Sequence, residues 1–407
     1  MTGPERRNGN ELPIGRRVAQ LRARRGMSQQ VFADRIRRSK SWVDKVERGV
    51  RTLDRLSVIE TVAGALGVAP GVLLAGTVRR AAGADTGGAV DEVRAALARY
   101  DFPGAGSDGQ PPSVQDLDHQ AGYAWTAYRN GHHPQVSRML PDLLDGSRRA
   151  CHPQSGNAPA ADLLVRVYRL AAQVLVKLGE ADLAWLAADR AMSAAAGDPR
   201  RAGLAAVSLA QALRALRRGR LAMTATRTAV HHLDLARSPD CPAGGPALAG
   251  TLLTEAALAA AACADAVAAG DLIGRTAHLA AAHDGRHHAD LDGIGFSPIT
   301  VELARALIAM HLGDHRQAVT IHREATGDDA WHLLPAEHRA AHLIDITRAH
   351  LDLGDPGAAG RALVAADAIA PAEIRLRPAA RVALTAVLRA GSPAADVTRL
   401  AATIGLS

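Results

Sequence analysis

Glycine turns between helical segments recur along most of this chain and restrict its fold to packed helical hairpins. From about residue 114 to residue 404, apolar residues follow helical spacing, and the alternation typical of strands is almost absent. The turns lie 48, 40, 51, 43, 41 and 37 residues apart, at Gly131, Gly179, Gly219, Gly270, Gly313, Gly354 and Gly391. Such a period between helices indicates stacked hairpins. We therefore expect an all-α fold whose largest part is a solenoid.

Three of the hairpins share a finer pattern. Alanine stands five residues after the turn glycine and again seven residues later, at Ala184 and Ala191, Ala318 and Ala325, and Ala359 and Ala366. These copies resemble tetratricopeptide (TPR) repeats, whereas the copies at Gly219, Gly270 and Gly391 miss the register. The resemblance implies a TPR-like solenoid over residues 114–404. It also implies a groove that takes a peptide, small molecule or protein, or a surface for self-association.

A separate helical pattern lies near the amino terminus. Ser28 and Ser39 each precede a short helical segment, and a serine hydroxyl is able to cap the free N–H groups there. Apolar residues keep one face of each segment: Phe32, Ala33, Ile36, Val43 and Val46. The second segment ends at Gly49 and is basic on its outer face. Two short helices with this layout predict a helix-turn-helix, which binds DNA.

The flanking sequence completes a small head over residues 14–74. An apolar stripe precedes the motif and another follows it: Ile14, Val18, Leu21, Leu56, Ile59, Val62 and Leu66. A short fifth helix around residues 72–74 would close a core of about 60 residues, which is near the lower size for independent folding.

The head resembles the Cro/C1-type (XRE-family) helix-turn-helix proteins. The resemblance is carried by Arg22, Arg25-Gly26, Ser28-Gln29, Ala33 and Glu47-Arg48-Gly49. It implies that Gln29 contacts the DNA backbone, and that Lys40, Ser41 and Lys45 touch base edges in the major groove. It also implies that Arg22 and Glu47 pair as a structural clamp. Two positions depart from the family: Arg37 replaces the usual turn glycine, and Arg38 replaces the usual apolar residue.

Other basic residues of the head are predicted to hold DNA phosphate, namely Arg17, Arg37, Arg38 and Arg51. Of the three lysines in the chain, Lys40 and Lys45 lie in the proposed recognition helix, although surface cations on short helices are also common. Trp42 is open to two interpretations. It either packs against a neighbouring helix, which we favour, or contacts bases.

Charge is distributed unevenly along the chain. Residues 1–80 hold 17 Lys and Arg against 7 Asp and Glu, a net of +10, and the remainder holds 31 against 34, a net of −3. A cationic head on a nearly neutral body fits attraction to phosphate through the head alone. Residues 75–113, rich in glycine and small residues, predict a flexible linker with a short helix.

The sequence predicts a cytoplasmic protein. It has no uninterrupted run of 18 apolar residues and no apolar leader after Met1, which argues against membrane spanning and export. Three scattered cysteines, Cys151, Cys241 and Cys263, form no paired framework, as expected in a reducing compartment.

The whole layout resembles a class of actinobacterial regulators that join such a head to a helical-repeat body, with residues 140–150 and 176–192 typical of it. Peptide-sensing regulators offer an architectural analogy, but they hold peptide backbone with asparagines. This chain has only four asparagines, and none lies beyond residue 157. We expect double-stranded DNA and a second copy of the chain as partners.

Two other functional classes are alternatives to a DNA-binding regulator. In one, the solenoid is an interaction module and the head an accessory. In the other, a metal-dependent hydrolase uses His283, His287, His288, Asp290 and Asp292, or the pair His338 and His342. The chain lacks HExxH, paired cysteines, a P-loop and a GxSxG motif. We therefore expect no catalytic residues, no metal and no cofactor.

Overall fold

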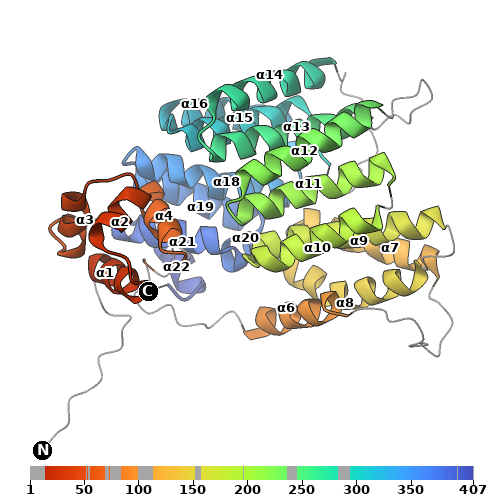
Figure 1. Cartoon of the computed structure of the whole chain (residues 1–407), viewed down its shortest axis with the longest axis horizontal. Helices are drawn as coiled ribbons and strands as arrows, with labels where there is room; N and C mark the ends of the chain where they lie inside the picture. Colours follow the sequence, from red (N-terminus) through yellow and green to blue (C-terminus); the bar gives the residue numbers. More distant parts are fainter. Residues whose placement is uncertain are drawn as a thin grey trace, which may run out of the picture. The chain divides into compact units, whose positions relative to one another are not determined.

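A computed structural model describes residues 14–51, 53, 56–68, 73, 84–99, 113–151, 157–195, 197–235, 245–282, 294–391 and 393–406. Every regular element among these residues is a helix, which confirms the predicted all-α fold (Figure 1). The chain divides into two units. The head unit comprises Met1–Ala82, Leu343–Ala365 and Pro378–Ser407, and the body unit comprises Gly83–His342 and Ala366–Arg377.

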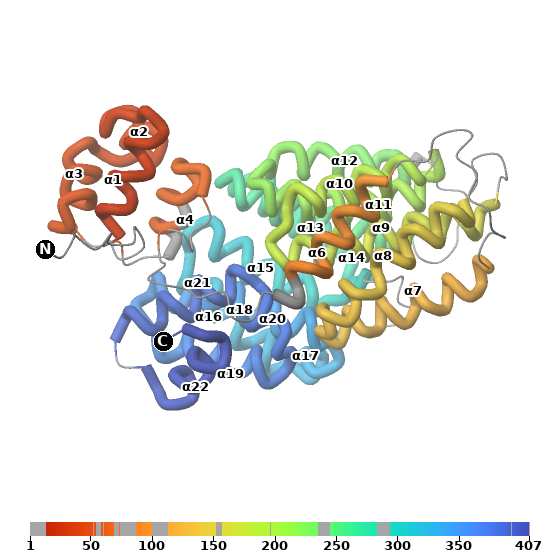
Figure 2. Tube along the Cα trace, turned by 90° about the horizontal axis from the view of Figure 1, so that it is seen from below, coloured from red at the N-terminus to blue at the C-terminus, as the bar shows by residue number. Residues whose placement is uncertain are grey.

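Four helices form the described part of the predicted head: α1 (Ile14–Arg24), α2 (Gln29–Arg35), α3 (Lys40–Glu47) and α4 (Leu56–Ala65) (Figure 2). Their apolar stripes meet in one core, in which Val18, Phe32, Val43, Ile59 and Leu66 are buried. The expected fifth helix lies largely outside the described residues. Leu73 is described there, and it is fully buried in the same core.

The head unit also includes the carboxyl-terminal helices α21 (Pro378–Arg389) and α22 (Ala395–Thr403). Gly360, in the 343–365 part of this unit, lets α22 approach closely, because a Cβ there would crowd the Val397 side chain. Arg381 donates from Nη2 to the carbonyl oxygen of Ile404 at 2.7 Å. Val382 of α21 belongs to the apolar core of the head, so these segments group with it, whereas the sequence pattern predicted a solenoid up to residue 404.

The body unit consists of successive antiparallel hairpins (Figure 1). Its helices are α6 (Ala84–Leu97), α7 (Val114–Arg129), α8 (His133–Ala150), α9 (Ala158–Leu178), α10 (Ala181–Ala194), α11 (Pro199–Ala215), α12 (Gly219–Leu235), α13 (Gly245–Ala262), α14 (Ala266–Ala282), α15 (Pro298–Leu312), α16 (His315–Thr326), α17 (Ala330–Leu333) and α20 (Pro371–Leu376). Two further helices, α18 (Ala336–Asp352) and α19 (Pro356–Ile369), run across the division between the units. Helices α9, α11 and α13 each pack on their own hairpin partner and on the first helix of the next hairpin. This is the stacking predicted for a solenoid.

The predicted turn positions hold for some hairpins and fail for two. Gly179 and Gly313 cap α9 and α15 with φ of 82° and 92°, a left-handed conformation that glycine adopts without strain. Gly219 begins α12, and Gly270 lies inside α14. The left-handed residues of those hairpins are Arg217 (φ 59°) and Ala264 (φ 61°). The glycine pattern missed these turns because non-glycine residues occupy the strained position.

The alanines of the TPR-like register lie in helix contacts. Ala184, Ala191, Ala318, Ala359 and Ala366 have no exposed surface, and Ala325 is 6 % exposed. A methyl side chain at these positions lets neighbouring helices approach closely, so the register marks helix contacts.

Helix α6 is the short helix predicted within the 75–113 linker, but it belongs to the body core. Its residues Val93, Ala96 and Leu97 are buried and join one cluster with side chains of α7 to α11. The pattern over 75–113 mixes this short amphipathic helix with two glycine-rich segments, and residues 75–83 and 100–112 lie outside the described part of the chain.

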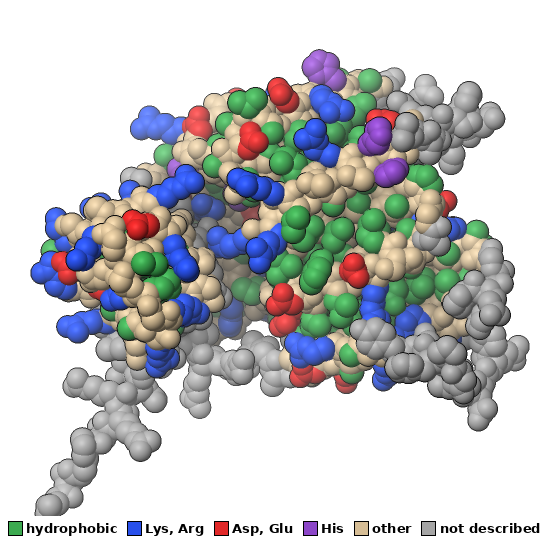
Figure 3. All heavy atoms as spheres, viewed as in Figure 1, with side chains coloured by type: hydrophobic (Ala, Val, Ile, Leu, Met, Phe, Trp, Pro, Cys, Tyr) green, Lys and Arg blue, Asp and Glu red, His purple; other side chains and the backbone are tan. Residues whose placement is uncertain are grey.

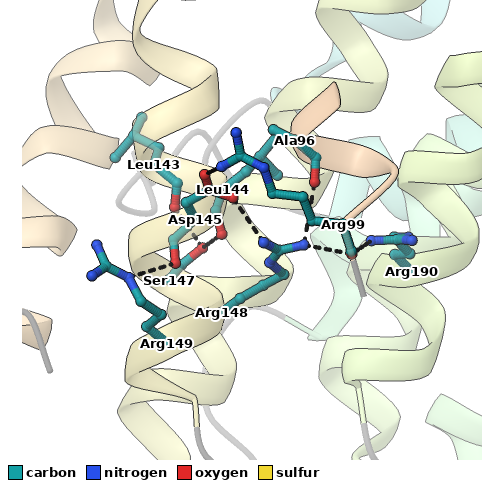
Figure 4. A network of polar contacts seen from close by, with 9 residues as sticks. All are labelled: Ala96, Arg99, Leu143, Leu144, Asp145, Ser147, Arg148, Arg149 and Arg190. Carbon is teal, nitrogen blue, oxygen red and sulfur yellow. Dashed lines mark hydrogen bonds and ion pairs between the residues drawn. The ribbon is translucent and has the colours of Figure 1, made fainter. Parts of the chain in front are cut away.

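Arginines of α8 and α10 fix the end of α6 (Figure 4). Arg148 donates from Nη1 to the carbonyl oxygens of Ala96 at 3.2 Å and Arg99 at 2.7 Å, and Arg190 donates to the latter at 3.4 Å. Asp145 accepts from Arg148 at 2.7 Å and pairs with Arg99. Carbonyl groups at a helix end have no partner within the helix, so these cations satisfy them.

A buried ionic cluster joins the beginning of the body unit to α20. Glu373 has no exposed surface; it lies 2.7 Å from Nε2 of His133 and 3.3 Å from Nζ of Lys177. Lys177 also pairs with Glu337, whose carboxylate accepts from Tyr128 at 3.4 Å. Burial alone would lower the pKa of Lys177, but the two carboxylates raise it above its usual value. The one lysine outside the head is therefore structural.

Helix α13 is long and apolar enough to meet the length and hydropathy of a membrane span, but 67 % of it is buried within the fold. Its Glu255 pairs with Arg214 and accepts from Gln211 at 2.9 Å, both on α11. Core helices of globular proteins pass the same test, so this helix is weak evidence for a membrane.

Candidate nucleic-acid interface

Two serine caps and a strained arginine define the turn between α2 and α3. The hydroxyl oxygens of Ser28 and Ser39 accept from the N–H groups of Val31 and Trp42, each at 3.2 Å. Arg37, where the Cro/C1 pattern has glycine, adopts φ of 53°. A side chain in this left-handed region costs free energy, so the turn keeps the family's geometry with a cation in the glycine position.

A part-buried ionic clamp holds the end of α3 against α1 and α2. Arg22 donates from Nε and Nη2 to the two carboxylate oxygens of Glu47, at 2.6 and 3.1 Å. Its Nη1 donates to the carbonyl oxygen of Met27 at 2.6 Å, and Gln29 donates to Oε2 of Glu47 at 2.9 Å. The hydrogen bonds to Glu47 raise the pKa of Arg22, against the opposing effect of burial. The pair implied by the Cro/C1 resemblance is therefore present.

Helices α1 and α3 approach so closely that Gly15 has no room for a side chain. A Cβ at this position would meet the backbone carbonyl of Val46 closer than any ordinary contact. This backbone contact therefore sets the distance between α1 and α3. The helical pattern around Gly15 did not by itself predict this role, although a glycine inside a predicted helix is a signal of close packing.

The residues predicted to touch bases share an exposed position on α3. Lys40, Ser41 and Lys45 are all exposed, while Val43 and Val46 face the core. Asp44 pairs with Arg48 one turn along the helix. Figure 3 shows basic side chains scattered over the visible face of the head. The exposed face of α3 therefore presents two cations and a hydroxyl to solvent.

Trp42 packs in the way we favoured. It is half-buried against the head core. The guanidinium carbons of Arg38 and Arg51 lie 5.6 and 6.0 Å from the centre of its ring, within cation–π range. The indole thus holds two of the predicted phosphate-binding arginines beside α3.

The other predicted phosphate contacts differ in exposure. Arg37, Arg38 and Arg51 are exposed, and Gln29 is half-buried with its amide directed to Glu47. Arg17 is only 6 % exposed, and burial, with the nearby charge of Arg389, lowers its pKa. The Arg17 side chain is therefore largely covered, which argues against the predicted contact with DNA phosphate. Its helical position alone did not reveal which neighbours cover it.

One of the two candidate metal-binding histidines on α18, His342, lies against His322 of α16. His342 is 3 % exposed, and its Nε2 lies 3.1 Å from Nδ1 of His322. Burial and the neighbouring His322 and His338 hold the pKa of His342 well below its usual value. Among the described residues no group of three or more histidine, cysteine, aspartate or glutamate side chains is placed to bind a metal. The cluster at residues 283–292 lies outside those residues.

Comparison with known proteins identifies the head. A family model described as a helix-turn-helix domain matches residues 13–75. The head is a Cro/C1-type helix-turn-helix domain. No curated protein matches the chain. The crystal structure of Bacillus thuringiensis PlcR in complex with the peptide PapR7 and DNA is similar at a TM-score of 0.31, with 9 % identity, over 77 % of this chain and 96 % of that one. So low a score carries no argument about this chain.

Proposed function

We propose that this protein is a sequence-specific DNA-binding transcriptional regulator. The observation that supports the proposal best is the exposed row of Lys40, Ser41 and Lys45 on a helix fixed by the Arg22–Glu47 clamp. In a helix-turn-helix, the first residues of the recognition helix contact base edges in the major groove. Lysine donates to guanine, and serine bonds to either kind of base, so these side chains suit direct base recognition.

Arginines beside α3 supply the sequence-independent part of binding. Arg37, Arg38 and Arg51 contact phosphate in this proposal, with Gln29 adding a neutral contact. Each phosphate that a cation neutralises releases counterions and contributes about −0.9 to the slope of log K against log salt. Three cations per head therefore give a slope of about −2.7 for one head and about −5.4 for a dimer.

In this proposal the body senses a ligand or partner, or mediates dimerisation, and has no catalytic role. Two heads on a dimer would bind half-sites about one DNA turn apart, as is usual for this motif. The protein acts in the cytoplasm, where it reaches the genome. Stacked hairpins with exposed helix faces support a binding role for the body.

The proposal is tested by selecting genomic fragments with the full-length protein and titrating the enriched fragment at several salt concentrations. Arg38→Gln is expected to reduce the magnitude of the slope by about one for each head. Arg227→Gln, which removes an exposed cation from α12, is the matched control and should leave the slope unchanged. Failure to enrich any fragment, or an equal response of the two variants, would contradict the proposal.

A further inference from the structure

An arginine-lined cavity of about 240 Å³ lies in the body unit between α7, α9 and α11. The lining residues are Asp118, Asp162, Val165, Arg166, Arg169, Arg200, Arg201 and Leu204. The volume is below the roughly 300–1,000 Å³ of pockets for drug-sized ligands, so the cavity suits a small molecule. Four of the eight side chains are cations, which is unusual for an ordinary ligand pocket, because such pockets are mostly apolar.

The two carboxylates of the lining are each bonded to a different arginine. Asp118 accepts from Arg166 at 2.7 Å, and Asp162 accepts from Arg201 at 2.7 Å. A third carboxylate nearby, Asp198, accepts from the backbone N–H of Arg201 at 2.8 Å and caps α11. With four arginines against two aspartates, the lining carries a net charge of +2.

Arg169 gives the cavity a fixed cation. Its side chain is 2 % exposed, and its guanidinium carbon lies 5.5 Å from the centre of the Trp125 ring. Trp125 is itself buried in the core of the body unit, so the stacking fixes the arginine against a rigid surface. Charges attract more strongly where water is largely excluded, which favours an anion beside this group.

We propose that this cavity binds a small molecule through a phosphate group. A phosphate monoester carries about −1.5 to −2 charges at pH 7, which matches the excess of two cations. Guanidinium groups bind phosphate with paired N–H donors, which suits the four lining arginines. Val165 and Leu204 offer apolar contact for the carbon part of the ligand. This site goes beyond the proposed function and does not depend on DNA binding by the head.

The test is calorimetric titration of the full-length protein with inorganic phosphate, at an ionic strength held constant with sodium chloride. Arg200 is exposed, so Arg200→Gln removes one lining cation without disturbing the core. Arg220→Gln removes an exposed cation of α12, outside the lining, and is the matched control. Because both variants keep the basic head, any phosphate bound there is the same in each. Circular dichroism checks that both fold.

We expect one saturable phosphate site in the wild type and in Arg220→Gln, and an affinity about tenfold lower in Arg200→Gln. The double variant Lys40→Ala/Lys45→Ala should retain the site, which separates this result from any failure of DNA binding. Malonate, a dianion without phosphate geometry, is the second probe and should bind more weakly. Equal affinity for Arg200→Gln and Arg220→Gln, no saturable site in the wild type, or tighter binding of malonate would overturn the proposal.

Discussion

Replacing Glu47 by glutamine should loosen the recognition helix while changing almost no volume. The substitution keeps one acceptor oxygen but removes the negative charge that receives two hydrogen bonds from Arg22 and one from Gln29. Arg22 would remain part-buried without its counter-charge. The clamp is mostly enclosed, since the side chains of Arg22 and Glu47 are 16 % and 7 % exposed.

The expected loss follows from that burial. Breaking a fully buried ion pair by removing one partner costs about 3–5 kcal/mol. Because Arg22 keeps some access to water and glutamine retains an acceptor, we expect a loss of about 2–3 kcal/mol in the free energy of local unfolding. A tenfold change in an equilibrium corresponds to about 1.4 kcal/mol, so exchange of the protected amides of α3 should accelerate roughly 30- to 150-fold.

Hydrogen exchange followed by mass spectrometry measures this effect within the head of the full-length protein. Asp44→Asn is the matched control, since it makes the same chemical change on the same helix. The pair that it breaks is exposed, with side-chain exposures of 62 % for Arg48 and 37 % for Asp44, so the loss should stay below about 1 kcal/mol. Similar acceleration in the two variants would refute the structural role assigned to the clamp.

Three other perturbations test separate parts of the account. Arg37→Gly should relieve a left-handed strain of about 1–2 kcal/mol, which the larger conformational entropy of the unfolded glycine chain partly offsets. Urea denaturation should therefore show equal or slightly higher stability. The salt slope of DNA binding should fall in magnitude by about 0.9, because one cation is removed. A less stable protein with an unchanged slope would contradict both assignments. Gly15→Ala should destabilise the head by about 1–3 kcal/mol, because the added methyl group clashes with the backbone of α3 even though alanine favours helices. Hydrogen exchange measures this loss. Unchanged protection of the head amides would show that the two helices adjust freely. Burial, with the neighbouring His322 and His338, lowers the pKa of His342 in the folded protein. As the pH falls below about 6.5, His342 therefore takes up a proton in the unfolded chain before it does so in the folded one. Stability should decline in that pH range by up to about 1.4 kcal/mol per pH unit. His342→Phe should flatten that decline in denaturation curves between pH 6.5 and 5, and an equally steep decline would assign it to other groups.

Local signals were sufficient to predict the head. Serine caps, helical spacing and the Arg22 and Glu47 positions all depend on short-range geometry, and each feature is present in the structure. The exposure of Lys40, Ser41 and Lys45 also follows from the helical period. The contacts of these side chains with DNA stay a prediction.

Long-range packing was not predictable from the same signals. The burial of Arg17, the place of α6 in the body core and the grouping of Pro378–Ser407 with the head depend on which distant helices meet. Glycine spacing also failed where Arg217 and Ala264 took the left-handed position. The cavity lined by arginines of α9 and α11 went unrecognised, because its residues are scattered along the chain and only the fold brings them together.

Base recognition by α3 is tested most directly by a specificity ratio. Fluorescence anisotropy would compare the affinity of the full-length protein for a selected fragment with that for a scrambled one, at a fixed salt concentration. Each good base contact contributes about 1–3 kcal/mol of discrimination, so Lys40→Ala/Lys45→Ala should reduce the ratio by about 30-fold or more, while binding to scrambled DNA weakens far less. If the double variant keeps the wild-type ratio, α3 does not select the sequence.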